Sequence, residues 1–343
     1  MSISLWFRTV RFSLAQARPS FIHHSFRSSC LFPFLPALWR SWAASLLVQS
    51  TSRSGLLSSR SPTSVATRPM YVIQPPQGHI DTNTLKTQMY IYVPKKLAAK
   101  PPVIVAIHHC QGTGPGYANE TPYNALADQY GFIVIYPSSP YSGTCWDVSS
   151  KASLTHNGGG DSNAIANMVT YTLTKYSGDS TRVYVTGSSS GAMMTNVMAA
   201  TYPSLFAAAI AYSGVAAGCF VSASGATDAW NSTCAQGKVD ASPAYWAGVV
   251  KGMYPGYSGA RPRFQVYHGS IDTTLLPPNY NETVKEWTGV LGGDWTRPQT
   301  VLRNFPHDGY TTDIWGVTAA SPLGTVQVCC FVEVWCRSGA DGS

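Results

Sequence analysis

The 343-residue sequence predicts an α/β fold in which helices cover both faces of a central, mostly parallel sheet. Strand-like and helix-like segments alternate along the middle of the chain, and such alternation produces parallel strands with helices on both sides. The run Val103–His109 is continuously apolar and rich in β-branched residues, which indicates a strand buried on both faces. Hydrophobic residues make up 44% of the chain and charged residues only 11%, which is enough apolar material for a large core.

The sequence predicts three helices and six strands. The pair Thr121-Pro122 predicts the start of a helix, with Thr121 as its N-cap, and Gly131 marks the end of that helix. Ser162–Tyr176 carries an apolar stripe at helical spacing that closes before Gly178, and Ala192–Ala200 is a third helix. Besides Val103–His109, strands are expected at Tyr90–Val93, Phe132–Tyr136, Val183–Val185, Ala207–Tyr212 and Phe264–Tyr267.

The first 70 residues differ from the rest in charge. They contain eight arginines, many serines, and no lysine, aspartate or glutamate, so we expect an extension outside the fold. A degraded or mispredicted secretion signal, a transit peptide and translated upstream sequence all fit this composition. The remaining residues carry 15 basic and 16 acidic side chains, which argues against a nucleic-acid partner. No run of 18 apolar residues occurs, so no membrane-spanning helix is expected.

Cysteines and glycosylation motifs in the body of the chain favour an oxidising, extracellular location. The body cysteines are Cys110, Cys145, Cys219 and Cys234. Their even number fits two disulfides, with buried free thiols as the alternative, and none has the spacing of a zinc site. Three N-glycosylation motifs begin at Asn119, Asn231 and Asn281. Together these features favour a secreted glycoprotein.

The sharpest motif is Gly187-Ser188-Ser189-Ser190-Gly191, which fits the pattern G-x-S-x-G. The expected strand Val183–Val185 precedes it and an expected helix follows, so Ser189 would sit on a sharp strand-to-helix turn as a nucleophile. The flanking glycines are then needed because strand and helix pack too tightly for side chains. A serine-rich and glycine-rich loop without chemistry is the alternative.

A serine nucleophile requires backbone donors for the developing oxyanion and an acid that follows it in the chain. The Ser190 amide is the first donor. The second is expected from the Cys110 or Gln111 amide, in the loop after Val103–His109. Asp272, just after the strand Phe264–Tyr267, is the expected acid, and a turn-forming aspartate is the alternative. No cofactor or metal is expected, because the pair His108-His109, interpreted as structural, lacks a spaced third ligand.

Residues from about Met89 to Gly316 resemble the fungal acetylxylan esterases of carbohydrate esterase family one, relatives of feruloyl esterases and polyhydroxybutyrate-depolymerase-like esterases. The resemblance rests on long stretches such as HHCQGTGPGY, VTGSSSGAMMTNVMAATYPSLF, YHGSIDTTLLPPNYNETVKEW and YTTDIWG. It implies a secreted α/β-hydrolase fold that removes acetyl groups from xylan, with Ser189 as nucleophile and Asp272 as acid. It also implies the disulfides Cys110–Cys145 and Cys219–Cys234.

The resemblance ends after Gly316. Family members continue with a G-x-G-H-type turn whose histidine is the general base, whereas no histidine follows His307 in this sequence. We therefore expect a catalytic α/β-hydrolase domain at residues 71–316 and a non-family tail at 317–343. The 343 residues as written are expected to be inactive or nearly so, and a gene-model fault at the ends is the simplest explanation.

The expected partner is acetylated xylan or a related plant cell-wall polysaccharide, bound by a monomer. Aromatic side chains that could stack on sugar rings are Trp146, Tyr141, Trp230, Trp246 and Tyr257, with core or loop packing as the alternative for each. Two other functions stay open. One is hydrolysis of feruloyl or other carboxylic esters, and the other is polysaccharide binding without catalysis.

Overall fold

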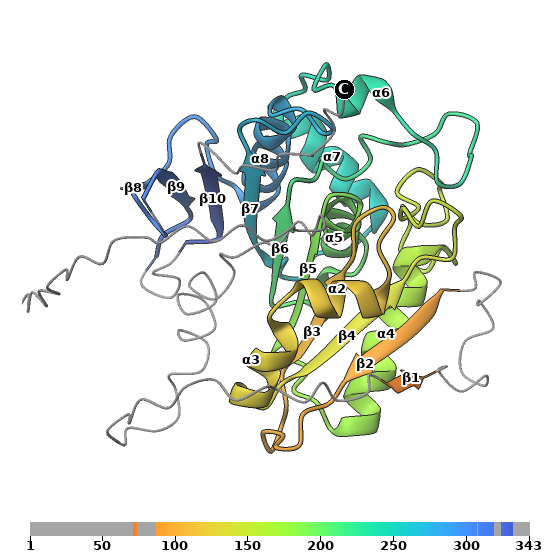
Figure 1. Ribbon diagram of the computed structural model, residues 1–343. Coiled ribbons are helices and arrows are strands. Elements are labelled where there is room, and N and C mark those ends of the chain that lie inside the picture. The colour runs from red at the N-terminus through yellow and green to blue at the C-terminus, as the bar shows by residue number, and fades with distance from the viewer. Residues whose placement is uncertain (1–70, 74–86, 307, 319–323, 332–343) are drawn as a thin grey trace, which may run out of the picture. The chain divides into compact units, whose positions relative to one another are not determined.

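The computed structural model describes residues 71–73, 87–306, 308–318 and 324–331 (Figure 1). These residues form a ten-stranded sheet in the order β1-β2-β4-β3-β5-β6-β7-β10-β9-β8. The strands are β1 (Tyr71–Ile73), β2 (Gln88–Tyr92), β3 (Val103–Ile107), β4 (Ile133–Ser138), β5 (Val183–Ser188), β6 (Ala208–Tyr212), β7 (Arg263–Gly269), β8 (Thr300–Arg303), β9 (Tyr310–Trp315) and β10 (Val326–Phe331). The six central strands, β4, β3, β5, β6, β7 and β10, pair in parallel. Antiparallel strands flank them at both edges, with β1 and β2 on one side and β9 and β8 on the other. The predicted fold class is confirmed.

Helices cover both faces of this sheet. They are α2 (Gly114–Glu120), α3 (Tyr123–Tyr130), α4 (Asp161–Tyr176), α5 (Ser190–Thr201), α6 (Ser232–Ala235), α7 (Pro243–Met253) and α8 (Pro278–Leu291), with a short 3-10 turn at Pro203–Leu205. Alternate residues of β3 enter two separate cores, because successive side chains of a strand point to opposite faces. Val103 and Val105 belong to the core cluster that also contains residues of α4, α5, α7 and α8, whereas Ile104 belongs to the cluster that contains residues of α2 and α3.

The helix expected from Thr121 to Gly131 is α3, and a further helix that the sequence did not predict, α2, ends just before Thr121. Thr113 is the N-cap of α2, where its side chain accepts a hydrogen bond from the Gly116 N–H. Thr121 caps the other end of that helix, and its hydroxyl donates to the Tyr117 carbonyl at 2.7 Å. The predicted N-cap role of Thr121 is therefore wrong, although Gly131 does end α3 in the left-handed conformation. The sequence concealed α2 because Gly-Pro-Gly at its start is typical of a turn.

The sheet continues past the domain boundary predicted at residue 316. Strand β10 pairs with β7 in parallel, from Val326 opposite Phe264 to Phe331 opposite Gly269, and with β9 on its other side. The whole extension 1–70 and most of the tail 317–343 fall outside the described residues, as does His307. In the part of the chain that the structure describes, no helix is long and apolar enough to cross a membrane.

Candidate active site

Ser189 occupies a strained turn between β5 and α5. Its backbone angles are φ 54° and ψ −119°, a region that non-glycine residues rarely adopt. A Cβ atom on Gly191 would lie 2.1 Å from the Ile107 carbonyl oxygen, and one on Gly187 would lie 2.4 Å from the Gly191 carbonyl oxygen. Only glycine fits at either position, so the two glycines allow β5 and α5 to approach closely enough to form the turn.

Backbone amides suited to an oxyanion lie beside this turn. Ser190 is the first residue of α5, so its N–H has no acceptor within the helix. Of the two amides expected from the preceding loop, that of Gln111 is occupied, because it donates to the Gly143 carbonyl at 3.0 Å. Among the described residues, the Cys110 amide has no hydrogen-bond acceptor. The geometry therefore favours Cys110 over Gln111 as the second donor.

The loop after β7 presents Asp272 at the same edge of the sheet. One carboxylate oxygen, Oδ1, accepts hydrogen bonds from the Thr274 and Leu275 amides at 2.9 and 3.0 Å. The other, Oδ2, lies 3.6 Å from His268 Nε2, and the side chain is 18% exposed. One oxygen is therefore fixed by the loop while the other remains available to a partner.

Hydrogen bonds between strand ends bring the two loops together. The Ser189 N–H donates to the Tyr212 carbonyl at the end of β6, at 2.9 Å. The Ser213 N–H in turn donates to the Tyr267 carbonyl, near the end of β7, at 2.7 Å. Since β5, β6 and β7 are parallel, Ser189 and the Asp272 loop emerge at the carboxyl edge of three adjacent strands.

The four described histidines each hydrogen-bond to a backbone carbonyl. His108, His109, His156 and His268 contact the carbonyls of His109, Cys110, Thr201 and Leu275, at 2.6 to 2.8 Å. Burial lowers the pKa of His108 to about 4, and its other ring nitrogen accepts the Ser139 N–H. Burial also lowers the pKa of His268. None of the four hydrogen-bonds to Ser189, so within the described ranges the base of a serine triad is not found.

Comparisons with known proteins assign the chain to a family. The family model described as esterase PHB depolymerase matches residues 87–286, which is more than half of the 343 residues. The chain belongs to this esterase family. Acetylxylan esterase A from Aspergillus awamori is 64% identical over 234 residues, covering 68% of this chain and 77% of that protein. The Aspergillus ficuum protein of the same name is 65% identical over 228 residues, covering 66% and 75%.

A solved structure of a relative supports the same placement. The acetyl xylan esterase from Aspergillus awamori superposes on this esterase with a TM-score of 0.73 and 58% sequence identity. The superposition covers 78% of this chain and 93% of that structure. The predicted resemblance to fungal acetylxylan esterases is confirmed. Both disulfides that it implied, Cys110–Cys145 and Cys219–Cys234, are formed in the structure.

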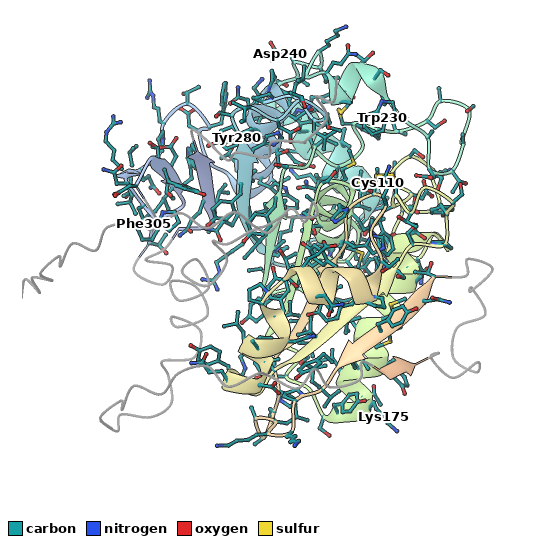
Figure 2. All side chains as sticks on the ribbon, viewed as in Figure 1. Cys110, Lys175, Trp230, Asp240, Tyr280 and Phe305 are labelled. Carbon is teal, nitrogen blue, oxygen red and sulfur yellow. A yellow bond between two sulfur atoms is a disulfide. The ribbon has the colours of Figure 1, made fainter. Side chains whose placement is uncertain are left out.

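The candidate sugar-stacking aromatics of this esterase differ sharply in exposure. Trp146 and Trp246 are 1% and 2% exposed, so both belong to the core. Tyr141 and Tyr257 are half-buried. Trp230, labelled in Figure 2, is 56% exposed and packs edge-to-face on Phe220, with ring centroids 5.2 Å apart. Trp230 is therefore the member of the five that can offer a ring to a ligand.

The three glycosylation motifs also lie in different surroundings. Asn119 on α2 and Asn281 on α8 are exposed. Asn231 is half-buried, and its side chain is engaged at both ends: Oδ1 accepts the Cys234 N–H at 3.0 Å, and Nδ2 donates to the Cys219 carbonyl at 3.2 Å. A glycan would be attached to that Nδ2 atom. The exposed pair therefore suits modification better than Asn231 does.

Proposed function

We propose that this esterase removes acetyl groups from acetylated xylan, with Ser189 as nucleophile, Asp272 as the acid, and the Cys110 and Ser190 amides as oxyanion donors. The observation that carries the proposal is the Ser189 turn, whose strained backbone lies directly before the amide of Ser190, the first residue of α5. The names of the Aspergillus relatives support acetylated xylan as the substrate. The disulfides and the exposed sequons support a secreted glycoprotein, and we propose that it acts as a monomer.

The reaction follows the usual serine-esterase sequence. Ser189 Oγ attacks the acetyl carbonyl carbon, and the carbonyl oxygen takes up negative charge that the two amides stabilise. The bond to the sugar oxygen then breaks, and the sugar leaves as an alcohol that carries the proton taken from Ser189. The acetyl group remains on Ser189 until water releases it as acetate, which restores the Ser189 hydroxyl. Asp272 would orient a histidine base and stabilise its charged form.

The sequence contains no histidine after His307, where the family resemblance places the base. In a well-studied serine protease, loss of the base alone lowers kcat by about 10⁶-fold, leaving only binding and oxyanion stabilisation. A polypeptide of these residues is therefore expected to deacetylate slowly by itself. Exogenous imidazole is the natural probe, because it can accept the Ser189 proton in place of a histidine side chain.

The deciding experiment is chemical rescue. We expect imidazole to raise acetate release from acetylated xylooligosaccharides in the unmodified chain, but not in its Ser189→Ala variant. Alkyl esters of this kind react slowly with imidazole alone, so the difference between the two proteins reports the enzyme. Equal rates in both would contradict the assignment of Ser189. Rapid turnover without imidazole would mean that another residue acts as base, and His307→Ala would then be tested first.

The choice of acyl group is tested with the same rescued protein. Preference for methyl ferulate over acetylated xylooligosaccharides would favour the feruloyl esterase alternative. Xylan binding that persists with no Ser189-dependent hydrolysis of either ester would favour the polysaccharide-binding alternative.

Trp230 is expected to bind the xylan chain rather than the acetyl group. Replacing Trp230 by alanine should raise KM for acetylated xylan by about fivefold, since loss of a stacked ring of this size costs about 1 kcal/mol. Tyr245→Ala is a matched control, because Tyr245 is an equally exposed aromatic side chain, at 57%. Equal effects of the two substitutions on KM would contradict a specific role for Trp230.

A further inference from the structure

The two oxyanion amides come from separate elements, and one dipeptide touches both. Cys145 is disulfide-bonded to Cys110. The next residue, Trp146, donates its backbone N–H to Ser190 Oγ at 2.8 Å, and both residues are almost completely buried. Trp146 also donates its indole N–H to the His108 carbonyl at 2.9 Å. The dipeptide Cys145-Trp146 therefore connects the loop after β3 to the first turn of α5.

The dipeptide is itself held in place from both sides. Ser139 Oγ donates to the Cys145 carbonyl at 2.6 Å, and the Ser139 N–H donates to His108 Nε2 at 3.1 Å. Gly143, in the same segment, accepts the Gln111 N–H. Gln111 has φ 62°, a left-handed conformation that needs support from its surroundings in a residue other than glycine. Residues 139–146 thus fix the shape of the loop that carries the Cys110 amide.

We propose that the dipeptide Cys145-Trp146 is a clamp that sets the spacing of the oxyanion amides, with Cys145 and the Ser190 hydroxyl as positioning residues. The inference rests on the proposed function. An oxyanion donor acts only when it lies about 2.7 to 3.1 Å from the charged oxygen, and a displacement of about 1 Å can cost about 10²-fold. Ser190 contributes in two separable ways: its amide donates to the oxyanion, and its hydroxyl oxygen accepts the hydrogen bond from the Trp146 N–H.

The second disulfide provides a matched control. Cys219–Cys234 closes a 15-residue separation in the chain, against 35 for Cys110–Cys145, so the two bridges should stabilise the fold to a similar extent. Around Cys219 and Cys234 the described residues show hydrogen bonds to Asn231, and none to the His108–Gly112 loop or to Ser190. Cys234→Ala therefore removes a disulfide and leaves the clamp intact.

Binding of methaneboronic acid tests the clamp without needing a base. Its boron accepts Ser189 Oγ, a proton is released to solvent, and the tetrahedral boronate that results presents an oxygen to the two amides. Boron NMR measures the affinity of the unmodified chain and of Cys145→Ala, Ser190→Ala, Ser190→Thr and Cys234→Ala, after thermal unfolding has confirmed that each variant folds. We expect Cys145→Ala and Ser190→Ala to weaken binding by about 10²-fold. We expect Cys234→Ala and Ser190→Thr, which keeps a hydroxyl, to stay within about threefold.

The outcomes separate this inference from the proposed function. Unchanged affinity in Cys145→Ala and Ser190→Ala would overturn the clamp, as would an equal loss in Cys234→Ala. If the unmodified chain forms no boronate adduct beyond that of Ser189→Ala, the assignment of Ser189 fails and the clamp fails with it. If Cys145→Ala does not fold, Ser190→Ala against Ser190→Thr decides, because neither change removes a disulfide.

Discussion

Gly191→Ala is expected to destroy the nucleophile turn and to destabilise the whole fold. The added methyl group would lie 2.1 Å from the Ile107 carbonyl oxygen and 2.6 Å from that of His108. Both are backbone atoms of the central strand β3 and the loop that follows it, so neither can move without displacing the sheet. Overpacking of a rigid core costs about 1–3 kcal/mol, and here we expect a loss of at least about 3 kcal/mol in the free energy of unfolding.

Gly248→Ala is the control for this substitution. Gly248 lies within the helix α7, and a Cβ built there meets no atom within 4 Å. Alanine is favoured over glycine in a helix by about 1 kcal/mol, so this variant should unfold at a higher urea concentration than the parent. Urea unfolding of the two variants and the parent checks both expectations. A Gly191→Ala protein as stable as the parent would show that the turn tolerates a side chain, contrary to the packing around it.

The nucleophile turn was predictable because its signals are local. Strand residues, a G-x-S-x-G motif and a helix follow one another within about twenty positions, and the close approach of β5 and α5 admits only glycine at Gly187 and Gly191. The position of Asp272 was predictable for a similar reason, since it follows directly after a strand that the sequence predicts. In each case the sequence could specify a backbone conformation without knowledge of the tertiary contacts.

The clamp was not predictable, because its contacts join residues far apart in the chain. Trp146 and Ser190 are 44 positions apart, and the donor is a backbone N–H that every residue except proline possesses. The choice between the Cys110 and Gln111 amides was hidden for the same reason, since it depends on a hydrogen bond from Gln111 to Gly143. Strand β10 (Val326–Phe331) was not among the predicted strands, although its residues form a largely apolar run.

The buried carboxyl group of Asp161 leads to the second prediction. Asp161 begins α4 and is 0% exposed. It accepts the Asp147 N–H at 3.0 Å and the Thr87 hydroxyl at 3.4 Å. Burial raises the pKa of Asp161 to about 7, and the neighbouring Asp147 carboxylate adds to that rise, against the hydrogen bond from the Asp147 amide. Asp147 stays ionised, because hydrogen bonds from Ser150, Asp228 and Ser149 lower its pKa in spite of burial.

The direction of the pH dependence follows from proton counts. Between pH 3.8, the ordinary value for this side chain, and about 7, the folded protein keeps a proton on Asp161 that the unfolded chain has lost. The free energy of unfolding therefore falls as pH rises through this window and levels off above pH 7. A shift of about 3 pH units corresponds to a loss of about 4 kcal/mol. His108 has the opposite effect on the free energy of unfolding: because burial lowers its pKa to about 4, its contribution rises as pH rises from about 4 to 6.5.

Replacing Asp161 by asparagine isolates its contribution from that of His108. Asparagine resembles the protonated acid in shape and cannot ionise, so Asp161→Asn should match the parent near pH 4 and exceed its stability by up to about 4 kcal/mol at pH 8. Urea unfolding of both proteins at the two pH values measures this difference directly, and the His108 contribution cancels between them. A stability difference that is the same at pH 4 and pH 8 would mean that Asp161 titrates near its ordinary value. The fold would then hold a buried carboxylate at the start of α4, stabilised by the amide of Asp147 and the positive end of the helix dipole.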